Sequence, residues 1–370
     1  MMFRIAPLLC LLLISPASVH SLATSSKKQA TGFGASKEPT FVHTPDTSGT
    51  TQQLLQFLKA QNSKGLDRVE IGIHQTTGVR GIFGLETFKK GQIICRIPSD
   101  CALALSDPTQ NGEDAPTLSH GGANFLSMYS KNEEARKLWA PYLDTLPEQG
   151  SAQFDPTPDF FNDEELELLE FPRLVKQAKE RKAEIAKVVA EKGIDAADLQ
   201  FATWLTASRA FRISMAATDN EEETNTDDRG QIVTKAGELK EIRVMVPFID
   251  MANHSSDHNN AKLTLIDPEK DDAWFALEAT RTIPAGKELV IAYGNGVEPS
   301  TEILMNYGFV PHSNKIDKFM LKKGGDDCIA SLDGWTTTLD EDKSMLSMVE
   351  DDATLTKILT FRIKLKEAYP

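Results

Sequence analysis

The sequence contains few cysteines and an excess of acidic residues. Four cysteines occur in 370 residues, and three of them (Cys95, Cys101 and Cys328) follow the apolar segment at the N-terminus. An odd and sparse set of this kind is not the disulfide framework of a small secreted fold. The formal net charge of −14 disfavours nonspecific binding to nucleic acid and to anionic lipid. We therefore expect neither nucleic acid nor a membrane as a partner of the mature protein.

No apolar run is long enough to span a bilayer, but a short one lies near the N-terminus. Residues 5–14 are apolar and precede a small-residue cleavage site at Ser21, which predicts a signal peptide over residues 1–21. No acidic residue occurs before Glu38, and residues 22–36 are rich in serine, threonine, lysine and alanine, as transit peptides are. The two segments in series predict import into a plastid bounded by extra membranes. Secretion is the alternative, which the sparse cysteines disfavour.

Strand-like patterns occur at both ends of the remaining chain, and helical patterns occur between them. Val69, Ile71 and Ile73 alternate with polar residues, whereas residues 172–191 repeat apolar side chains at helical spacing and stop at Gly193. Strands at both ends with helices inserted between them predict an α+β fold. The expected helices are 53–60, 124–130, 133–138, 163–170, 172–191 and 198–213, and the expected strands are 69–73, 92–97, 242–248, 261–266, 274–277 and 289–292.

Two apolar runs end abruptly in polar residues. The first begins at Val244 and ends in Asp250, Asn253 and His254, and the second ends in Tyr293, forty positions after Asn253. Polar groups delivered from the edge of a buried element are typical of binding sites.

A metal site is one hypothesis for the first of these runs. Asp250, His254 and His258 are four residues apart, so a helix would place them on one face and could support a metal-dependent hydrolase. Residues 255–260 are poor helix formers, however, which argues against that arrangement.

Two further segments carry weaker signals. The glycine-rich residues 78–84 match neither a dinucleotide-binding nor a phosphate-binding loop, but they could let the backbone approach a flat ligand. Arg209 lies among Trp204, Leu205 and Phe211, so it either extends its charge to water or holds a carboxylate.

Taken in order, these segments resemble the SET-domain protein methyltransferases. Within that family they look like the group of the Rubisco large-subunit lysine methyltransferase and its actin-histidine relative, and the resemblance covers roughly residues 65–312. Its motifs are the glycine turn at 78–84, Pro141-Tyr142-Leu143-Asp144-Thr145-Leu146-Pro147, Ser208-Arg209-Ala210-Phe211, residues 246–255, Tyr293-Gly294, and Asn306-Tyr307-Gly308-Phe309-Val310.

The resemblance implies a fold and a domain order. It implies a SET-domain β fold over residues 61–315 with a helical insertion at about 119–205. The transit-like segment and linker at 22–60, expected from composition, precede this domain. Residues 316–370 would be a short remnant of the C-terminal substrate-docking region of this group, with a helix at 354–369. Two departures from the group are this short C-terminal region and the sequence Gly78-Val79-Arg80-Gly81 in place of Gly-x-Gly.

The resemblance also implies S-adenosylmethionine as cofactor and no metal, since the cysteine cluster that binds zinc in other members is absent. The expected activity is transfer of methyl groups to a lysine of a protein substrate, such as the Rubisco large subunit or another plastid protein, by a monomeric enzyme. Methylation of histidine and a catalytically silent SET-like binding module are the alternatives. The implied cofactor residues are Val79, Arg80, Gly81, Ile82, Arg209, Asn253 and His254, the implied catalytic residue is Tyr293, and the implied substrate-binding residues are Asp250, Tyr293 and Tyr307.

Overall fold

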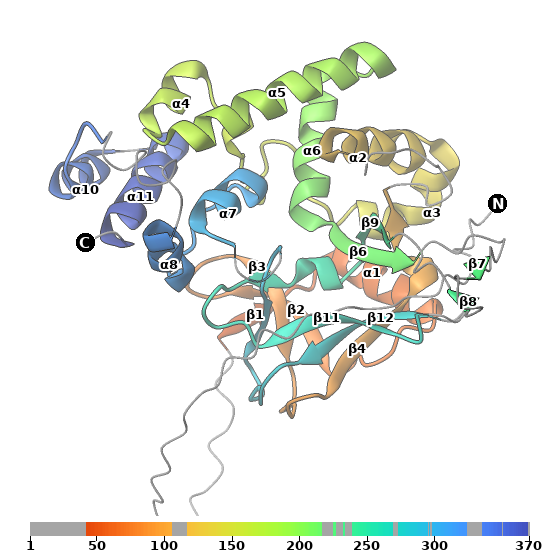
Figure 1. Cartoon of the computed structure of the whole chain (residues 1–370). Coiled ribbons are helices and arrows are strands. Elements are labelled where there is room, and N and C mark those ends of the chain that lie inside the picture. Colours follow the sequence, from red (N-terminus) through yellow and green to blue (C-terminus); the bar gives the residue numbers. More distant parts are fainter. Residues whose placement is uncertain are drawn as a thin grey trace, which may run out of the picture.

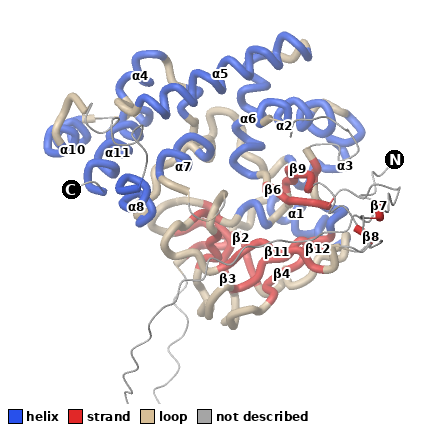
Figure 2. The backbone as a smooth tube through the Cα atoms, in the orientation of Figure 1, coloured by secondary structure: helices blue, strands red, loops and turns tan. Residues whose placement is uncertain are grey.

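The computed structural model describes most of the chain after the predicted leader. The described residues are 42–105, 117–216, 225–226, 232–233, 239–268, 273–294, 296, 298–323, 335–349 and 351–368. The predicted signal and transit-like segments and Cys328 lie outside them. Helices gather on one side of the molecule and most strands on the other, which confirms the α+β class (Figures 1 and 2). No helix in the described part of the chain is both long and apolar enough to cross a membrane.

The strands form small sheets, and one of them joins both ends of the SET-like region. Its order is β1-β2-β3-β13-β10, and all neighbours are antiparallel except β10 and β13, which are parallel. This sheet contains β1 (His43–Pro45), β2 (Val69–His74), β3 (Arg80–Gly84), β13 (Glu288–Ile291) and β10 (Asn253–His254). The other sheets contain β11 (Ala261–Ile266), β12 (Trp274–Ala279) and β4 (Ile93–Pro98); β5 (Leu103–Ala104), β9 (Leu239–Met245) and β6 (Phe211–Ala216); and β7 (Asn225–Thr226) with β8 (Ile232–Val233).

The predicted helices are present, and the sequence explains their ends. Helix α5 (Pro172–Lys192) begins with proline at its first position and ends where Gly193 adopts a positive φ of 64°. The other helices are α1 (Gly49–Ala60), α2 (Leu118–Phe125) with a π-helical turn (Leu126–Ser130), α3 (Glu133–Leu143), α4 (Asp163–Leu168), α6 (Ala196–Arg209), α7 (Ser300–Tyr307), α8 (Lys315–Lys323), α10 (Leu339–Met348) and α11 (Ala353–Ala368).

The prediction of a helix over residues 198–213 is wrong in its last turn. Helix α6 stops at Arg209, Ala210 is extended, and the chain continues as β6. Phe211 and Ile213 pair with Val244 and Ile242 of β9, so a sheet ladder replaces the final helical hydrogen bonds. Aromatic and β-branched side chains suit a strand better than a helix end, which explains the change. Arg209 consequently occupies the junction between a helix and a sheet.

The C-terminal helix packs into the helical half of the molecule. Ile358, Phe361 and Leu365 of α11 share a buried cluster with residues of α4, α5 and α7, among them Leu166 and Leu304. This arrangement places α11 beside α4 and α8 (Figure 1). The helix expected at 354–369 is therefore present, and its role in substrate docking stays a prediction.

Candidate active site

A strained turn at Phe248 sets the direction in which the polar residues Asp250, Asn253 and His254 leave β9. After β9, Phe248 is fully buried and has φ 74° and ψ −54°, which is a rare conformation for a residue with a side chain. The backbone N–H of Asp250 donates to Val246 O at 3.0 Å and closes the turn. The chain then makes one 3-10 turn (Ile249–Met251) and extends as β10, which carries Asn253 and His254.

Parallel pairing of β10 with β13 brings His254 to Tyr293. His254 lies opposite Ile291, and the backbone N–H of Tyr293 donates to His254 Nδ1 at 3.0 Å. Because Nδ1 accepts a hydrogen bond, the ring proton lies on Nε2, which is 2.7 Å from Ser256 Oγ. Burial lowers the pKa of His254 from 6.5 to about 4. The imidazole is therefore neutral near pH 7.

Tyr293 lies in a group of aromatic rings. Its ring centroid is 4.6 Å from Tyr307 and 5.0 Å from His254, and Phe309 lies 6.4 Å from Tyr293 and 5.9 Å from His254. The Tyr293 hydroxyl donates to Ala252 O at 3.0 Å. Burial raises the pKa of Tyr293, so the phenol is neutral and its oxygen keeps lone pairs for a further donor. Phe309 was not predicted as a site residue, although it belongs to the Asn306–Val310 motif.

Asp250 joins Arg209 to Tyr142 in the interior. The Asp250 side chain is fully buried; its Oδ2 accepts from the Tyr142 hydroxyl at 2.6 Å and lies 3.4 Å from Arg209 Nη1. Asp250 Oδ1 is buried and has no hydrogen-bond partner among the described residues. Burial raises the pKa of Asp250, and Arg209 and Tyr142 offset only part of that effect. Tyr142 was not predicted as a site residue; its only sequence signal was its place in the Pro141–Pro147 motif.

The glycine turn meets Asn253 through the backbone. Asn253 Nδ2 donates to Arg80 O at 2.9 Å and to Glu288 Oε1 at 2.7 Å. The Arg80 guanidinium donates to Thr145 O at 2.8 Å. Val79 is 49% exposed and Ile82 is fully buried, so only the backbone of Ile82 could reach a ligand. Glu288 was not predicted as a site residue, because a single polar residue at the start of an apolar strand is no signal of a site.

The structure thus brings the predicted site residues together from distant parts of the chain. Arg80 and Gly81 lie beside Asn253, His254 lies beside Tyr293 and Tyr307, and Arg209 lies beside Asp250. His258 is not part of this group: its backbone N–H donates to Ser255 Oγ, and its carbonyl accepts from Arg281. The described residues contain no group of three His, Cys, Asp or Glu side chains that could hold a metal ion. The metal hypothesis based on Asp250, His254 and His258 therefore finds no support in the geometry.

Comparisons with known proteins give the same assignment as the motifs. The family model described as "SET domain" matches residues 79–294. A solved structure described as the SET domain of LSMT bound to MeLysine and AdoHcy aligns with a TM-score of 0.60 at 16% identity, covering 87% of this chain and 90% of that chain. The structure of Rubisco LSMT bound to AdoMet aligns with a TM-score of 0.57 at 15% identity over the same shares of the two chains. No curated protein sequence matches the chain. Because the family match spans more than half of its residues, the chain belongs to the SET-domain family.

Proposed function

We propose that this protein is an S-adenosylmethionine-dependent protein methyltransferase that modifies a lysine side chain. The observation that carries the proposal is the junction of β10 and β13, where a neutral His254 lies against a neutral Tyr293 inside a group of aromatic rings. Membership of the SET-domain family supports methyl transfer. The solved structures that resemble the chain include one described as LSMT bound to lysine and AdoHcy, which supports lysine as the target.

The residues around this junction fit the cofactor. Gly81 leaves room above Asn253, since a Cβ there would meet Asn253 Nδ2 at 2.8 Å. Arg209 uses Nη1 for Asp250, and a guanidinium has further N–H donors that could hold a carboxylate. We assign the cofactor to the backbone of residues 79–82 and to Arg209, Asn253 and His254. When bound, S-adenosylmethionine supplies a methyl group already activated on a sulfonium.

The protein's task is then to present a neutral amine in line with that methyl group. A free lysine has a pKa near 10.4, so neutralising it at pH 7 costs roughly 4–5 kcal/mol. The rings of Tyr293, Tyr307 and Phe309 would surround the amine, and desolvation lowers the pKa of an amine. The rings therefore reduce the cost of deprotonation and fix the direction of approach.

Tyr293 orients the amine and does not act as a base. Its raised pKa keeps the phenol protonated, and its proton is donated to Ala252 O. The remaining lone pairs on the hydroxyl oxygen can accept a hydrogen bond from an amine N–H. This contact would hold the nitrogen lone pair toward the methyl group.

Cofactor binding and label transfer test the proposal. Isothermal titration of the protein lacking residues 1–36 with S-adenosylmethionine should show one site per chain. Incubation with methyl-labelled cofactor and a plastid-stroma extract should label a protein band, and mass spectrometry should place the methyl group on lysine. Absence of binding at millimolar cofactor would refute the enzyme assignment, whereas methylated histidine would refute the lysine assignment alone.

We further propose that the protein acts in a plastid, on a protein of that compartment such as the Rubisco large subunit. Support comes from the apolar segment at 5–14 followed by the acid-free segment at 22–36. A fluorescent protein fused after residue 60 should reach the plastid, and deletion of residues 22–36 alone should leave it in the secretory pathway. Secretion of the intact fusion would contradict the proposal.

A further inference from the structure

Glu288 is a partly buried carboxylate at the start of β13, next to the residues assigned to the cofactor. It lies opposite Phe83 of β3. Its Oε1 accepts a hydrogen bond from Asn253 Nδ2 at 2.7 Å. The contact links the two parallel strands β13 and β10 through their side chains, just before His254.

This contact and a second one fix which way the Asn253 amide faces. An amide nitrogen carries two N–H donors, and Asn253 gives one to Arg80 O and one to Glu288 Oε1. A carbonyl oxygen can only accept, so turning the amide over would set Oδ1 against Arg80 O and the Glu288 carboxylate. The amide oxygen is therefore the atom of Asn253 that remains for a ligand, and it can only accept a hydrogen bond.

Gly81 provides the space for this arrangement. A Cβ at position 81 would meet Glu288 Oε1 well inside van der Waals distance and Asn253 Nδ2 at 2.8 Å. A side chain there would push the two partners apart. The second glycine of the turn thus leaves room for the Asn253–Glu288 contact as it stands and for close approach of a ligand.

A second carboxylate in the same sheet shows how Glu288 differs. Glu70 of β2 lies opposite Phe83 from the other side, and it pairs with His43 Nε2 at 2.7 Å. Among the described residues no ion pair is formed by Glu288, whose hydrogen-bond partner is the neutral Asn253 amide. Burial raises the pKa of Glu288, and the hydrogen bond from Asn253 offsets part of that rise. Glu288 therefore differs from Glu70 in using its carboxylate to hold the Asn253 amide.

We propose that Glu288 is a positioning residue for the cofactor, holding the Asn253 amide so that Oδ1 accepts a hydrogen bond from the ammonium group of S-adenosylmethionine. The inference rests on the proposed function, because it requires the cofactor to bind at Asn253. It assigns Glu288 no contact with the reacting atoms.

Four variants test this role by calorimetric titration with S-adenosylhomocysteine and with its deaminated analogue, in which hydrogen replaces the amino group. Glu288→Ala should weaken binding of S-adenosylhomocysteine roughly tenfold or more, because the Asn253 amide is then free to turn. Glu288→Asp should do the same, since its carboxylate is drawn back by one methylene. Glu288→Gln should stay within about threefold of wild type, since its amide oxygen can still accept from Asn253 and keep the Asn253 amide from turning. Glu70→Ala is the matched control and should bind as wild type does.

The deaminated analogue separates positioning from a general loss of structure. Wild type should prefer S-adenosylhomocysteine over the analogue, and Glu288→Ala should bind both about equally. The inference is overturned if Glu288→Ala keeps the preference, if Glu288→Gln is as weak as Glu288→Ala, or if Glu70→Ala is equally weakened. Should Glu288→Ala fail to fold, Glu288→Asp gives the same readout. Failure of wild type to bind either compound would instead refute the proposed function.

Discussion

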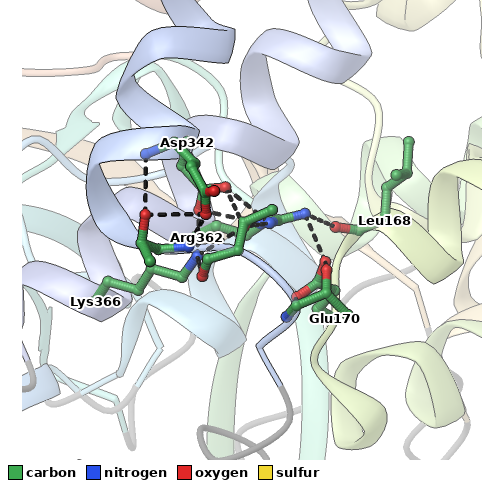
Figure 3. A network of polar contacts seen from close by, with 9 residues as sticks. Leu168, Glu170, Asp342, Arg362 and Lys366 are labelled. Atoms are coloured by element: carbon green, nitrogen blue, oxygen red, sulfur yellow. Dashed lines mark hydrogen bonds and ion pairs between the residues drawn. The ribbon is translucent and has the colours of Figure 1, made fainter.

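Two buried aspartates in this molecule have very different surroundings. Asp342 of α10 lies in a network with Arg362 and Lys366 of α11, which also reaches Glu170 and the carbonyl of Leu168 (Figure 3). Asp342 Oδ1 is 2.7 Å from Arg362 Nη2, and Oδ2 is 2.6 Å from Lys366 Nζ. Both of its oxygens thus have a cationic partner.

Asp250 in the active site has an incomplete set of partners. One cation, Arg209, approaches at 3.4 Å, Tyr142 donates to the same oxygen, and Oδ1 has no partner among the described residues. The pKa shifts run in opposite directions. Burial raises the pKa of Asp250, whereas for Asp342 the hydrogen bonds from Lys366 and Thr337 and the charge of Arg362 outweigh burial and lower the pKa. The complete network stabilises the C-terminal helices, whereas Asp250 keeps one buried oxygen without a partner among the described residues.

The largest effect on stability should come from breaking the complete network. Arg362→Met leaves the buried Asp342 with Lys366 alone and removes the cation that pairs with the half-buried Glu170, which should lower the free energy of unfolding by about 3–5 kcal/mol. Urea denaturation followed by circular dichroism measures the change. Lys187→Met is the control, because Lys187 forms an exposed ion pair with Glu191 and should change stability by less than about 1 kcal/mol. A loss below 1 kcal/mol for Arg362→Met would mean that the network contributes no more than a surface pair.

Removing the Tyr293 hydroxyl should mainly affect turnover. Tyr293→Phe keeps the ring against Tyr307 but removes the oxygen proposed to orient the amine, so kcat should fall roughly a hundredfold while cofactor affinity changes little. Tyr129→Phe is a matched control, since Tyr129 also donates its hydroxyl to a backbone carbonyl, that of Ala104 at 2.9 Å. Steady-state kinetics with labelled cofactor distinguish the two variants. Equal turnover in Tyr293→Phe and wild type would remove Tyr293 from the mechanism.

Breaking the network around Asp250 should weaken cofactor binding more than it lowers the free energy of unfolding. Arg209→Ala should weaken cofactor binding by roughly 1.5–3 kcal/mol, because it removes the charged hydrogen bond proposed for the cofactor carboxylate. Asp250 can take up a proton when its cation is lost, since its pKa is already raised, so stability should fall less than in Arg362→Met. Arg136→Ala, which breaks an exposed ion pair with Asp144 on α3, is the control. Calorimetry and urea denaturation on the same samples test both statements, and a larger stability loss at Arg209 than at Arg362 would reverse the comparison.

Much of this molecule could be predicted from the sequence because its signals are local. The apolar spacing and the terminal proline and glycine of α5 gave its bounds to within one residue. The motifs around Arg209, Asn253 and Tyr293 likewise identified the family. The error at 210–213 arose because the pairing of β6 with β9, which ends α6 at Arg209, joins residues distant in sequence.

Contacts between distant residues explain what the sequence could not show. Tyr142 and Asp250 are 108 positions apart, and nothing in either segment indicates that their side chains meet. In the sequence, Glu288 has the pattern of a solvent-facing residue after a glycine turn. The parallel pairing of β13 with β10, which the sequence does not indicate, places its side chain against Asn253.

The smallest expected effect is the pH dependence of stability that His254 contributes. The folded state lowers the pKa of His254 from 6.5 to about 4, so between these values the unfolded chain binds a proton that the folded chain does not. The stability that His254 contributes is therefore present above pH 6.5 and is lost as the pH falls, by on the order of 1–2 kcal/mol at pH 5. In His254→Asn the amide oxygen can still accept from the Tyr293 N–H but does not titrate. The stability difference between wild type and this variant, measured by urea denaturation at pH 7 and pH 5, should shift by that amount in favour of the variant at pH 5. Parallel pH profiles would show that His254 titrates as it does in the unfolded chain, and that burial at the β10–β13 junction is weaker than the geometry indicates.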